Sequence, residues 1–330
     1  MIDVTQIVCR SRLFAFGVAV VALVGACQAT VLAQGSAPDS ARAARRFAPG
    51  VLTTIEPQID REDGVSIHDI VEIRAQQDLE WEPKTLAKSQ TLFAMADSAP
   101  YLQDVWCLEF TFKPMRMIEV DLPRPDGTVR RELVWYMVYR VRNTGAAAQA
   151  VLADDGTYST KPQTAGALRF LPQFVLTSHD VPGPDGAPKS YLDRVLPAAN
   201  APIVEREFRG GALLNSVQMA SRELAVEEGR SQQGEWGVAT WQGVDSDTDF
   251  FSIYVGGLTN AYQWDDPEGA FTAGDPPGTG RTFRRKMLQL NFWRPGDRYG
   301  QDEREIRYGV PEGKGALYEG GDGVTHRWVF

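Results

Sequence analysis

The sequence predicts a mainly β protein: an antiparallel, immunoglobulin-like sandwich with a small helical N-terminal segment. Two observations support this class. From residue 105 onward, large apolar residues alternate with polar ones over short runs, which is typical of half-buried strands. Clusters rich in Gly, Pro and Asp separate these runs, as in sandwiches whose strands are joined by tight turns. The chain has no internal repeat of fixed period.

The first 33 residues have the pattern of an export signal. Arg10 and Arg12 precede an uncharged apolar run over 13–24, and Val31-Leu32-Ala33 comes after it. A positive start, an apolar stretch of about 7–15 residues and small residues at the end are typical of secretory signals. We therefore expect the rest of the chain to be extracytoplasmic, in the periplasm or the cell envelope.

Three fates of this segment stay open. Signal peptidase cleavage after Ala33 fits the small residues at that point. Lipidation at Cys27 is the alternative, because Val24-Gly25-Ala26-Cys27 resembles a bacterial lipobox with Val in place of the usual Leu. The third is an uncleaved anchor over 13–33, which is long enough to cross about 30 Å of hydrocarbon as a helix.

A linker and a helical segment are predicted before the β region. Residues 34–50 are rich in Ala, Ser, Arg and Pro and nearly lack large apolar side chains, which favours a flexible linker. Residues 51–100 are predicted to be helical, with apolar side chains at helical spacing in 65–74 and again in 84–96. Whether the following β region divides into two sub-domains near 210–230 stays open.

Residues 101–330 are predicted to form the β region. Apolar residues occupy every second position of 106–112, and 118–122 alternate in the same way before the turn Arg124-Pro125-Asp126-Gly127. Residues 133–143 start with both faces apolar, which predicts a central strand. Further strands are predicted at 168–176, 203–208, 236–242, 250–255, 287–293, 306–308 and 327–330.

Part of this pattern resembles known exported proteins. The segment VWYMVYRVRNTG over 134–145 resembles a strand and turn of exported bacterial immunoglobulin-like domains, and 237–241 resembles a later Gly-led strand of them. Together with VWCLEFTFKP, FFSIYVGGLTNAY and LQLNFWRPGDRYG, it is similar to uncharacterised exported proteins of planctomycete-type bacteria. The resemblance covers most of residues 100–310. It implies a location and a fold class, and it carries no known activity or site residues.

Charge and cysteine content narrow the classes of partner. A net charge of −9 argues against nucleic acid and against an anionic membrane surface, so membrane contact is expected only through the N-terminal segment. The basic run over 281–286 is interpreted as a solvated strand end. Cys107 is the only cysteine outside the export segment, and we predict that it is a buried apolar residue.

No catalytic residue is predicted from motifs. The sequence lacks a phosphate loop, a G-x-S-x-G elbow and an H-E-x-x-H motif. Ser178-His179-Asp180 is interpreted as a turn or strand end, since neighbours on a strand point to opposite faces. A cofactor is not expected, apart from calcium.

The calcium hypothesis rests on Asp245, Asp247 and Asp249. Carboxylates at every second position can place hard oxygen ligands on one side of a tight turn. Phe250 stands where an EF-hand requires Gly, so that motif is excluded. A looser site, joined by Asp265, Asp266 or Glu268, competes with a solvated acidic loop.

Aromatic residues suggest a second binding hypothesis. Trp236, Trp241 and Trp264 lie close in sequence and could form a platform for a glycan. Trp236 and Trp241 are five positions apart, so a regular strand turns them to opposite faces and buries at least one.

The sequence thus favours an exported, non-catalytic envelope protein that binds a partner or has a structural role. The partner is either another envelope protein or a polysaccharide. The alternative is an extracytoplasmic hydrolase that uses two carboxylates, which requires a cleft and one carboxyl group with a raised pKa.

Overall fold

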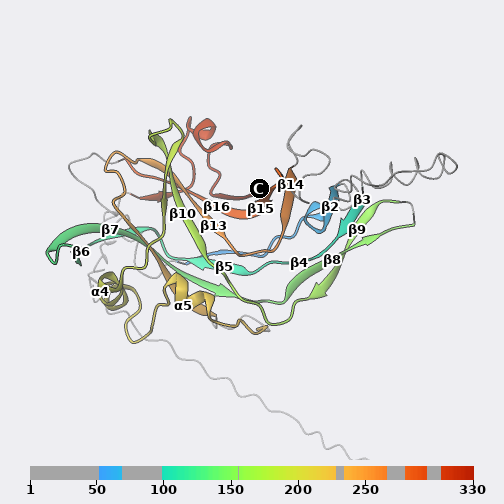
Figure 1. The fold of residues 1–330 in the computed structure, drawn as a ribbon, viewed down its shortest axis with the longest axis horizontal. Coiled ribbons are helices and arrows are strands. Elements are labelled where there is room, and N and C mark those ends of the chain that lie inside the picture. The colour runs from blue at the N-terminus through green and yellow to red at the C-terminus, as the bar shows by residue number, and fades with distance from the viewer. Residues whose placement is uncertain (1–51, 69–98, 155, 228–233, 266–278, 296–305) are drawn as a thin grey trace, which may run out of the picture. The chain divides into compact units, whose positions relative to one another are not determined.

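The computed structural model describes residues 52–68, 99–154, 156–227, 234–265, 279–295 and 306–330. The predicted export signal over 1–33, the linker over 34–50 and the helix over 84–96 lie outside these residues. Strands make up most of the secondary structure, and all paired strands run antiparallel (Figure 1). The mainly β, antiparallel class is confirmed, and the immunoglobulin-like sandwich stays a prediction.

The first sheet is built around one long strand, β7 (Val129–Arg142). β12 (Glu235–Gln242) pairs with one edge of β7. The other edge is shared by β6 (Arg116–Pro123), which pairs with the first part of β7, and by β5 (Glu109–Phe112), which pairs with its last part. β1 (Thr53–Ile55) adds to β5 at the border of the sheet. The predicted central strand over 133–143 therefore lies inside β7.

The second sheet contains the strands of the C-terminal half. Across the sheet, their order is β11 (Pro188–Leu192), β10 (Gln173–Pro182), β13 (Phe250–Gly256) and β16 (Met287–Trp293). The free edge of β16 is shared by two short strands, β17 (Arg307–Tyr308) and β18 (His326–Val329). The strands predicted at 250–255 and 287–293 correspond to β13 and β16.

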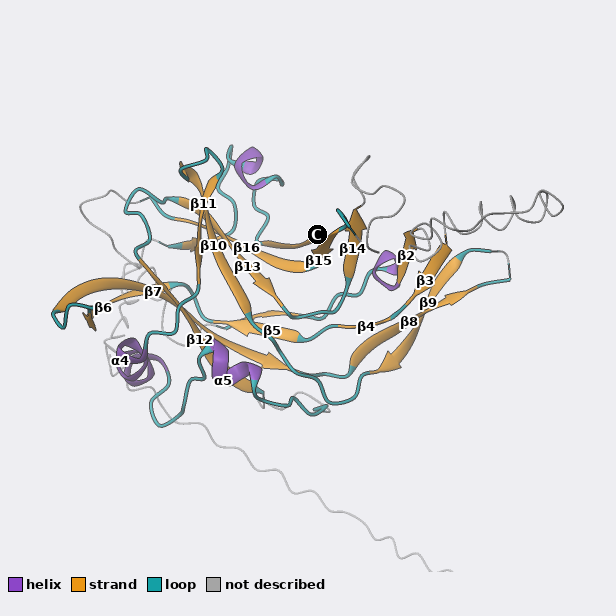
Figure 2. Ribbon diagram, in the orientation of Figure 1, coloured by secondary structure: helices purple, strands orange, loops and turns teal. Residues whose placement is uncertain are grey.

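Smaller elements surround the two sheets. The remaining strands are β2 (Val65–His68) with β3 (Ala99–Leu102), β4 (Asp104–Trp106) with β8 (Ala146–Leu152) and β9 (Tyr158–Thr164), and β14 (Tyr262–Asp265) with β15 (Thr282–Arg285). The helices are α4 (Pro197–Glu207), α5 (Ser216–Ala220) and the 3-10 helices η2 (Arg61–Gly64) and η5 (Gly315–Tyr318), and Figure 2 shows α4 and α5 beside the first sheet. No helix among the described residues is long and apolar enough to cross a membrane.

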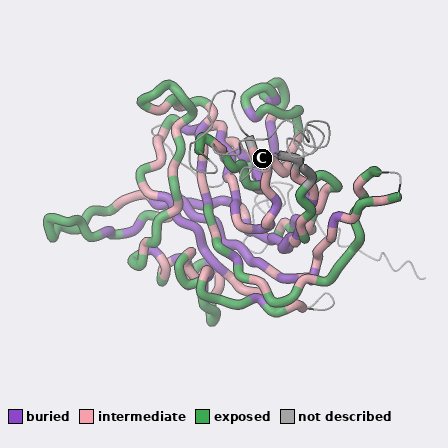
Figure 3. The backbone as a smooth tube through the Cα atoms, turned by 45° about the vertical axis from the view of Figure 1, so that its right-hand side comes forward, coloured by how far each residue is buried: buried purple, intermediate pink, exposed green. Residues whose placement is uncertain are grey.

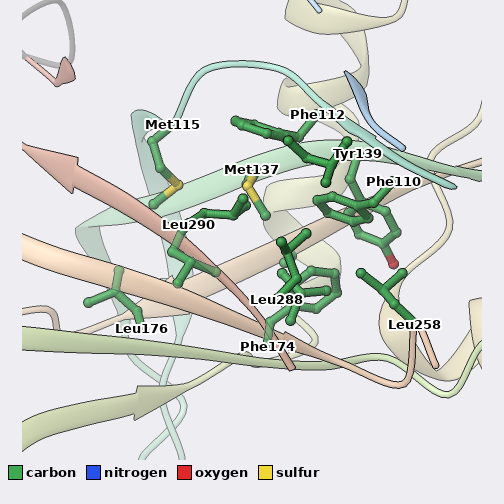
Figure 4. Close-up of a cluster of buried hydrophobic side chains, with 14 of the residues drawn as sticks. Phe110, Phe112, Met115, Met137, Tyr139, Phe174, Leu176, Leu258, Leu288 and Leu290 are labelled. Atoms are coloured by element: carbon green, nitrogen blue, oxygen red, sulfur yellow. The ribbon is translucent and has the colours of Figure 1, made fainter. Parts of the chain in front are cut away.

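The two sheets share one apolar core. Aromatic rings from the first sheet meet rings from the second, with centroids 5.3 Å apart for Trp135 and Phe251 and 4.8 Å apart for Tyr139 and Phe174. Figure 4 shows part of this core, where side chains of β5 and β7 face those of β10 and β16. Buried residues gather in the strands of both sheets, whereas the hairpin turns are exposed (Figure 3). Cys107 is fully buried, as predicted.

β7 is buried on both faces. Trp135, Met137 and Tyr139 point into the shared core, and the residues between them point the other way. There they form a second cluster with Ala199 and Ile203 of α4. This arrangement explains why the start of the segment reads as apolar at every position.

Two sequence predictions are wrong in the described residues. The segment 203–208 was predicted as a strand, but it belongs to α4, because Ala199 and Ile203 are four residues apart and pack together on the second cluster. The helix predicted over 65–74 begins as strand β2 instead, because antiparallel pairing with β3 satisfies its backbone groups. Its remaining residues lie outside the described part of the chain.

Candidate functional site

A cavity of about 560 Å³ lies where the β14–β15 hairpin meets the ends of β4, β10 and β13. We call it the aromatic pocket. Its lining includes three aromatic and three polar side chains that the argument below uses: Trp106, Tyr262, Phe283, Arg169, Arg285 and Asn260. These residues are distant in sequence, so the pocket exists only once both sheets and the hairpin have formed.

Asn260 attaches one wall of the pocket to β4. Its Oδ1 accepts a hydrogen bond from the backbone N–H of Trp106 at 2.9 Å, and its Nδ2 donates to the carbonyl of Asp104 at 2.9 Å. The backbone N–H of Leu108 donates to the carbonyl of Leu258 at 2.8 Å in the same junction. These bonds fix the position of Trp106, whose indole lines the pocket.

Gly257 allows the chain to turn beside the pocket. Its φ of +87° lies in the region that side chains disfavour, and a Cβ added there would lie 2.2 Å from the carbonyl oxygen of Leu171. Only glycine fits this close approach of two backbone segments. The wall of the pocket therefore depends on a residue without a side chain.

The hairpin presents a cluster of aromatic rings. The rings of Trp264 and Phe283 have centroids 4.4 Å apart, and that of Tyr262 lies 6.0 Å from each of them. The guanidinium of Arg281 lies 4.1 Å from the ring centroid of Trp264. Phe283 remains 57% exposed, which is uncommon for a ring with apolar neighbours and typical of binding surfaces.

The described lining of the pocket is positively charged. Arg169 and Arg285 are exposed at its border, and no Asp or Glu is among the described residues that line it. The basic run over 281–286 is therefore more than a solvated strand end. Arg281 lies over a tryptophan, Arg285 lines the pocket, and Lys286 is buried.

The structure does not bring the three predicted glycan-binding tryptophans together. Trp241 is fully buried in the shared core, so its prediction as a binding residue is wrong; strand alternation turns it toward Phe174. Trp236 packs against Phe208, 5.1 Å between centroids, in the second cluster. Trp264 belongs to the aromatic group beside the pocket.

The three aspartates of the calcium hypothesis share one loop, but two of them face cations. Asp245 Oδ2 lies 3.0 Å from Lys189 Nζ, and Asp249 Oδ1 lies 3.6 Å from Arg294 Nε. Asp247 donates its backbone N–H to Asp245 Oδ1 at 3.1 Å. Among the described residues, no group of three His, Cys, Asp or Glu side chains is placed to hold a metal ion. Asp266 and Glu268 lie outside those residues, and calcium binding stays a prediction.

His179, interpreted from the sequence as part of a turn or strand end, lies within hydrogen-bond distance of a serine that sequence reasoning missed. His179 Nε2 is 2.7 Å from Ser252 Oγ, but Ser252 is fully buried and donates its own proton to Asn291 Oδ1 at 2.8 Å. Its oxygen accepts from Gln289 Nε2 at 3.2 Å. Ser252 Oγ thus takes part in a buried polar network with Gln289 and Asn291, which gives the His179–Ser252 contact a structural role in the core of the second sheet. Burial lowers the pKa of His179, which favours the neutral ring.

The carboxylate pair nearest to the hydrolase hypothesis is Asp180 with Asp249. The backbone N–H of Asp249 donates to Asp180 Oδ2 at 2.8 Å, and Ser178 Oγ donates to Asp180 Oδ1 at 2.7 Å. Burial raises the pKa of Asp249, Arg294 opposes this, and the charge of Asp180 adds to it. Neither carboxylate is part of the described lining of the aromatic pocket.

Comparisons of the chain with protein-family models, with curated proteins and with solved structures gave no match.

Proposed function

We propose that this chain is an exported, non-catalytic envelope protein that binds a carboxylate-bearing polysaccharide in the aromatic pocket. The observation that carries the proposal is the composition of the pocket: its lining combines exposed and half-buried rings with two arginines, and it has no described carboxylate. Trp106, Tyr262 and Phe283 provide apolar faces for the C–H surface of a sugar ring.

Arginine fits the acidic part of such a ligand. Its planar guanidinium can donate two parallel hydrogen bonds to one carboxylate, a geometry that lysine lacks. Arg169 and Arg285 can therefore fix uronic acid units by their charge while the rings hold the sugar faces. The net charge of −9 repels a polyanion at long range, so binding requires this local reversal of charge.

The location is part of the same proposal. The charged start, apolar run and small residues over 1–33 support export, with cleavage after Ala33, lipidation at Cys27 and an uncleaved anchor as the three forms to distinguish. The resemblance to exported proteins of planctomycete-type bacteria supports it, and two antiparallel sheets with a common core agree with an immunoglobulin-like sandwich.

Tryptophan fluorescence during titration with polygalacturonate tests the proposal, with dextran as the neutral comparison. We expect a saturable change with polygalacturonate, weaker at high salt, and none with dextran. Phe283→Ala and Arg285→Gln should each weaken binding at least about tenfold, which corresponds to about 1.4 kcal/mol.

The matched controls are Val217→Ala, another exposed apolar side chain, and Arg222→Gln, another exposed arginine. Both should bind like the wild type. Equal binding of both polysaccharides, or equal loss in the control variants, would contradict the proposal. A response to an acidic peptide alone would redirect it to a protein partner.

The hydrolase alternative keeps one supporting observation, the raised pKa of Asp249 beside Asp180. It predicts that reducing ends appear when the protein is incubated with a polysaccharide, and that Asp249→Asn abolishes them. If the polysaccharide is bound but no reducing ends appear, the binding function stands alone.

A further inference from the structure

Lys286 connects β15 and β16 and turns inward from the border of the aromatic pocket. Its side chain is 2% exposed, and its Nζ lies 2.5 Å from Asp63 Oδ2 and 2.6 Å from Asp60 Oδ2. The rings of Trp328 and Phe330 lie 5.7 Å and 5.8 Å from the same nitrogen. A lysine is rarely buried so deeply unless a specific interaction holds it there.

Asp63 is buried even more completely. Its side chain is 1% exposed, and its Oδ2 also accepts the backbone N–H of Asp60 at 2.8 Å within the capping interaction of η2. Its other oxygen, Oδ1, is buried and has no hydrogen-bond partner among the described residues. An ionised carboxylate with one oxygen unsatisfied away from water is costly.

We propose that Lys286 and Asp63 are joined by an isopeptide bond, an amide between Lys286 Nζ and Asp63 Cγ, and that Asp60 relays a proton during its formation. The amide replaces two buried charges with a neutral group. This removes the desolvation cost of the ion pair, and burial protects the product from water.

The reaction balances without a cofactor. Asp60 takes one proton from the ammonium, and the freed amine lone pair forms a bond to Cγ of Asp63. One carboxylate oxygen of Asp63 then leaves as water, with the proton that Asp60 returns and a second proton from the nitrogen. The fixed contact between the two groups supplies the effective concentration that this condensation needs.

Asp60 is placed for this role. Its Oδ2 contacts Lys286, while Gln58 Nε2 donates to its Oδ1 at 3.0 Å and holds the side chain in position. The hydrogen bond from Gln58 and that from Lys286 lower the pKa of Asp60, which keeps its carboxylate ionised, and its contact with Lys286 Nζ gives the proton a direct path. Its side chain is 43% exposed, which gives the released water a way out.

Mass spectrometry of the purified full chain tests the proposal. The expected intact mass is lower than the sequence mass by one water molecule, after allowance for N-terminal processing. Trypsin cleaves after Arg61 and Arg285 but not after a modified Lys286, so a peptide that starts at Glu62 should appear linked to one that starts at Lys286. A free peptide that starts at Met287, with no linked species, would overturn the proposal.

Asp60→Asn tests the relay because it keeps both reacting groups. We expect its unlinked fraction to rise strongly, while Asp63→Ala should abolish the link. Lys189 and Asp245 form an exposed pair at 3.0 Å and serve as the internal control, which should stay unlinked in every sample. Full linkage in Asp60→Asn would remove Asp60 from the mechanism.

Discussion

Arg285 and Lys286 are neighbours in sequence, yet they have opposite surroundings. Arg285 is exposed at the border of the aromatic pocket, whereas Lys286 is buried between two aspartates. Arg285 is the last residue of β15 and Lys286 lies between β15 and β16, so two adjacent residues have different surroundings. The same stretch of chain therefore contributes to the proposed binding surface and to a buried charged cluster.

The largest effect on stability is expected from replacing the buried residue, Lys286. Lys286→Met leaves the buried carboxylate of Asp63 with neither a cation nor the proposed amide bond to neutralise it, so the free energy of unfolding should fall by about 3–5 kcal/mol. Denaturant unfolding measures it. Lys189→Met, which breaks an exposed pair, should cost less than about 1 kcal/mol. Equal losses in the two variants would show that burial does not distinguish these lysines.

The wall of the aromatic pocket is tested by Gly257→Ala. The added Cβ overlaps the carbonyl of Leu171 and meets an unfavourable φ, so we expect a loss of about 2–4 kcal/mol. Gly186→Ala is the matched control, because Gly186 has a similar φ of +80° but no atom near its Cβ. It should lose about 1 kcal/mol, from backbone strain alone. Thermal unfolding of both variants separates overlap from strain.

His179, which is half-buried near Asp180, Glu319 and Arg327, gives a smaller, pH-dependent effect. The unfolded chain binds the proton with the ordinary pKa of 6.5, and burial lowers the folded value. Between these two pKa values, the unfolded state binds more protons than the folded state. The contribution of His179 to the free energy of unfolding is therefore fully present above pH 6.5 and is lost as the pH falls through the folded pKa.

His179→Gln should make the free energy of unfolding less dependent on pH. The stability lost between high and low pH should decrease by about 1.4 kcal/mol for each unit by which folding lowers the pKa of His179. Denaturant unfolding between about pH 5 and 7.5 measures the slope. Burial also lowers the pKa of His326. This residue is present in both the wild type and the His179→Gln variant, so part of the pH dependence remains in both. An unchanged slope in the variant would show that His179 is not the responsible group.

The smallest effect on stability is expected at Phe283, on the exposed surface beside the aromatic pocket. Phe283→Ala removes a ring that is 57% exposed, so the free energy of unfolding should change by less than about 0.5 kcal/mol. Calorimetry of the unliganded protein measures it. A large loss would show that the ring is part of the packed structure, and its effect on ligand binding would then need a different explanation.

The strands could be predicted from sequence where large apolar side chains are frequent and the strand is buried. This apolar pattern located β13 and β16 almost to the residue. It failed for 203–208, because a short apolar run can fit either a strand or one face of a helix, and only packing against β7 decides. Strands β8 and β9 were missed, because their side chains are mostly exposed and small or polar.

The candidate site was harder to predict. The tryptophans were chosen by nearness in sequence, and Trp264 alone lies beside the pocket. Trp106, Arg169 and Arg285 come from three distant segments that meet only through the sheets. One signal was present in the sequence: Phe283 and Arg285 share a face of a short strand, which places a ring and a cation side by side.

The double burial of β7 constrains how this protein can evolve. A single inserted or deleted residue in its middle would exchange the side chains of its two faces, moving Trp135 toward α4 and Tyr136 toward Phe251. Both clusters consist of buried side chains, so a misplaced side chain on either face would disturb close packing. Changes in chain length should therefore accumulate in the hairpin turns on either side, and this strand should serve as the fixed reference when distant relatives are aligned.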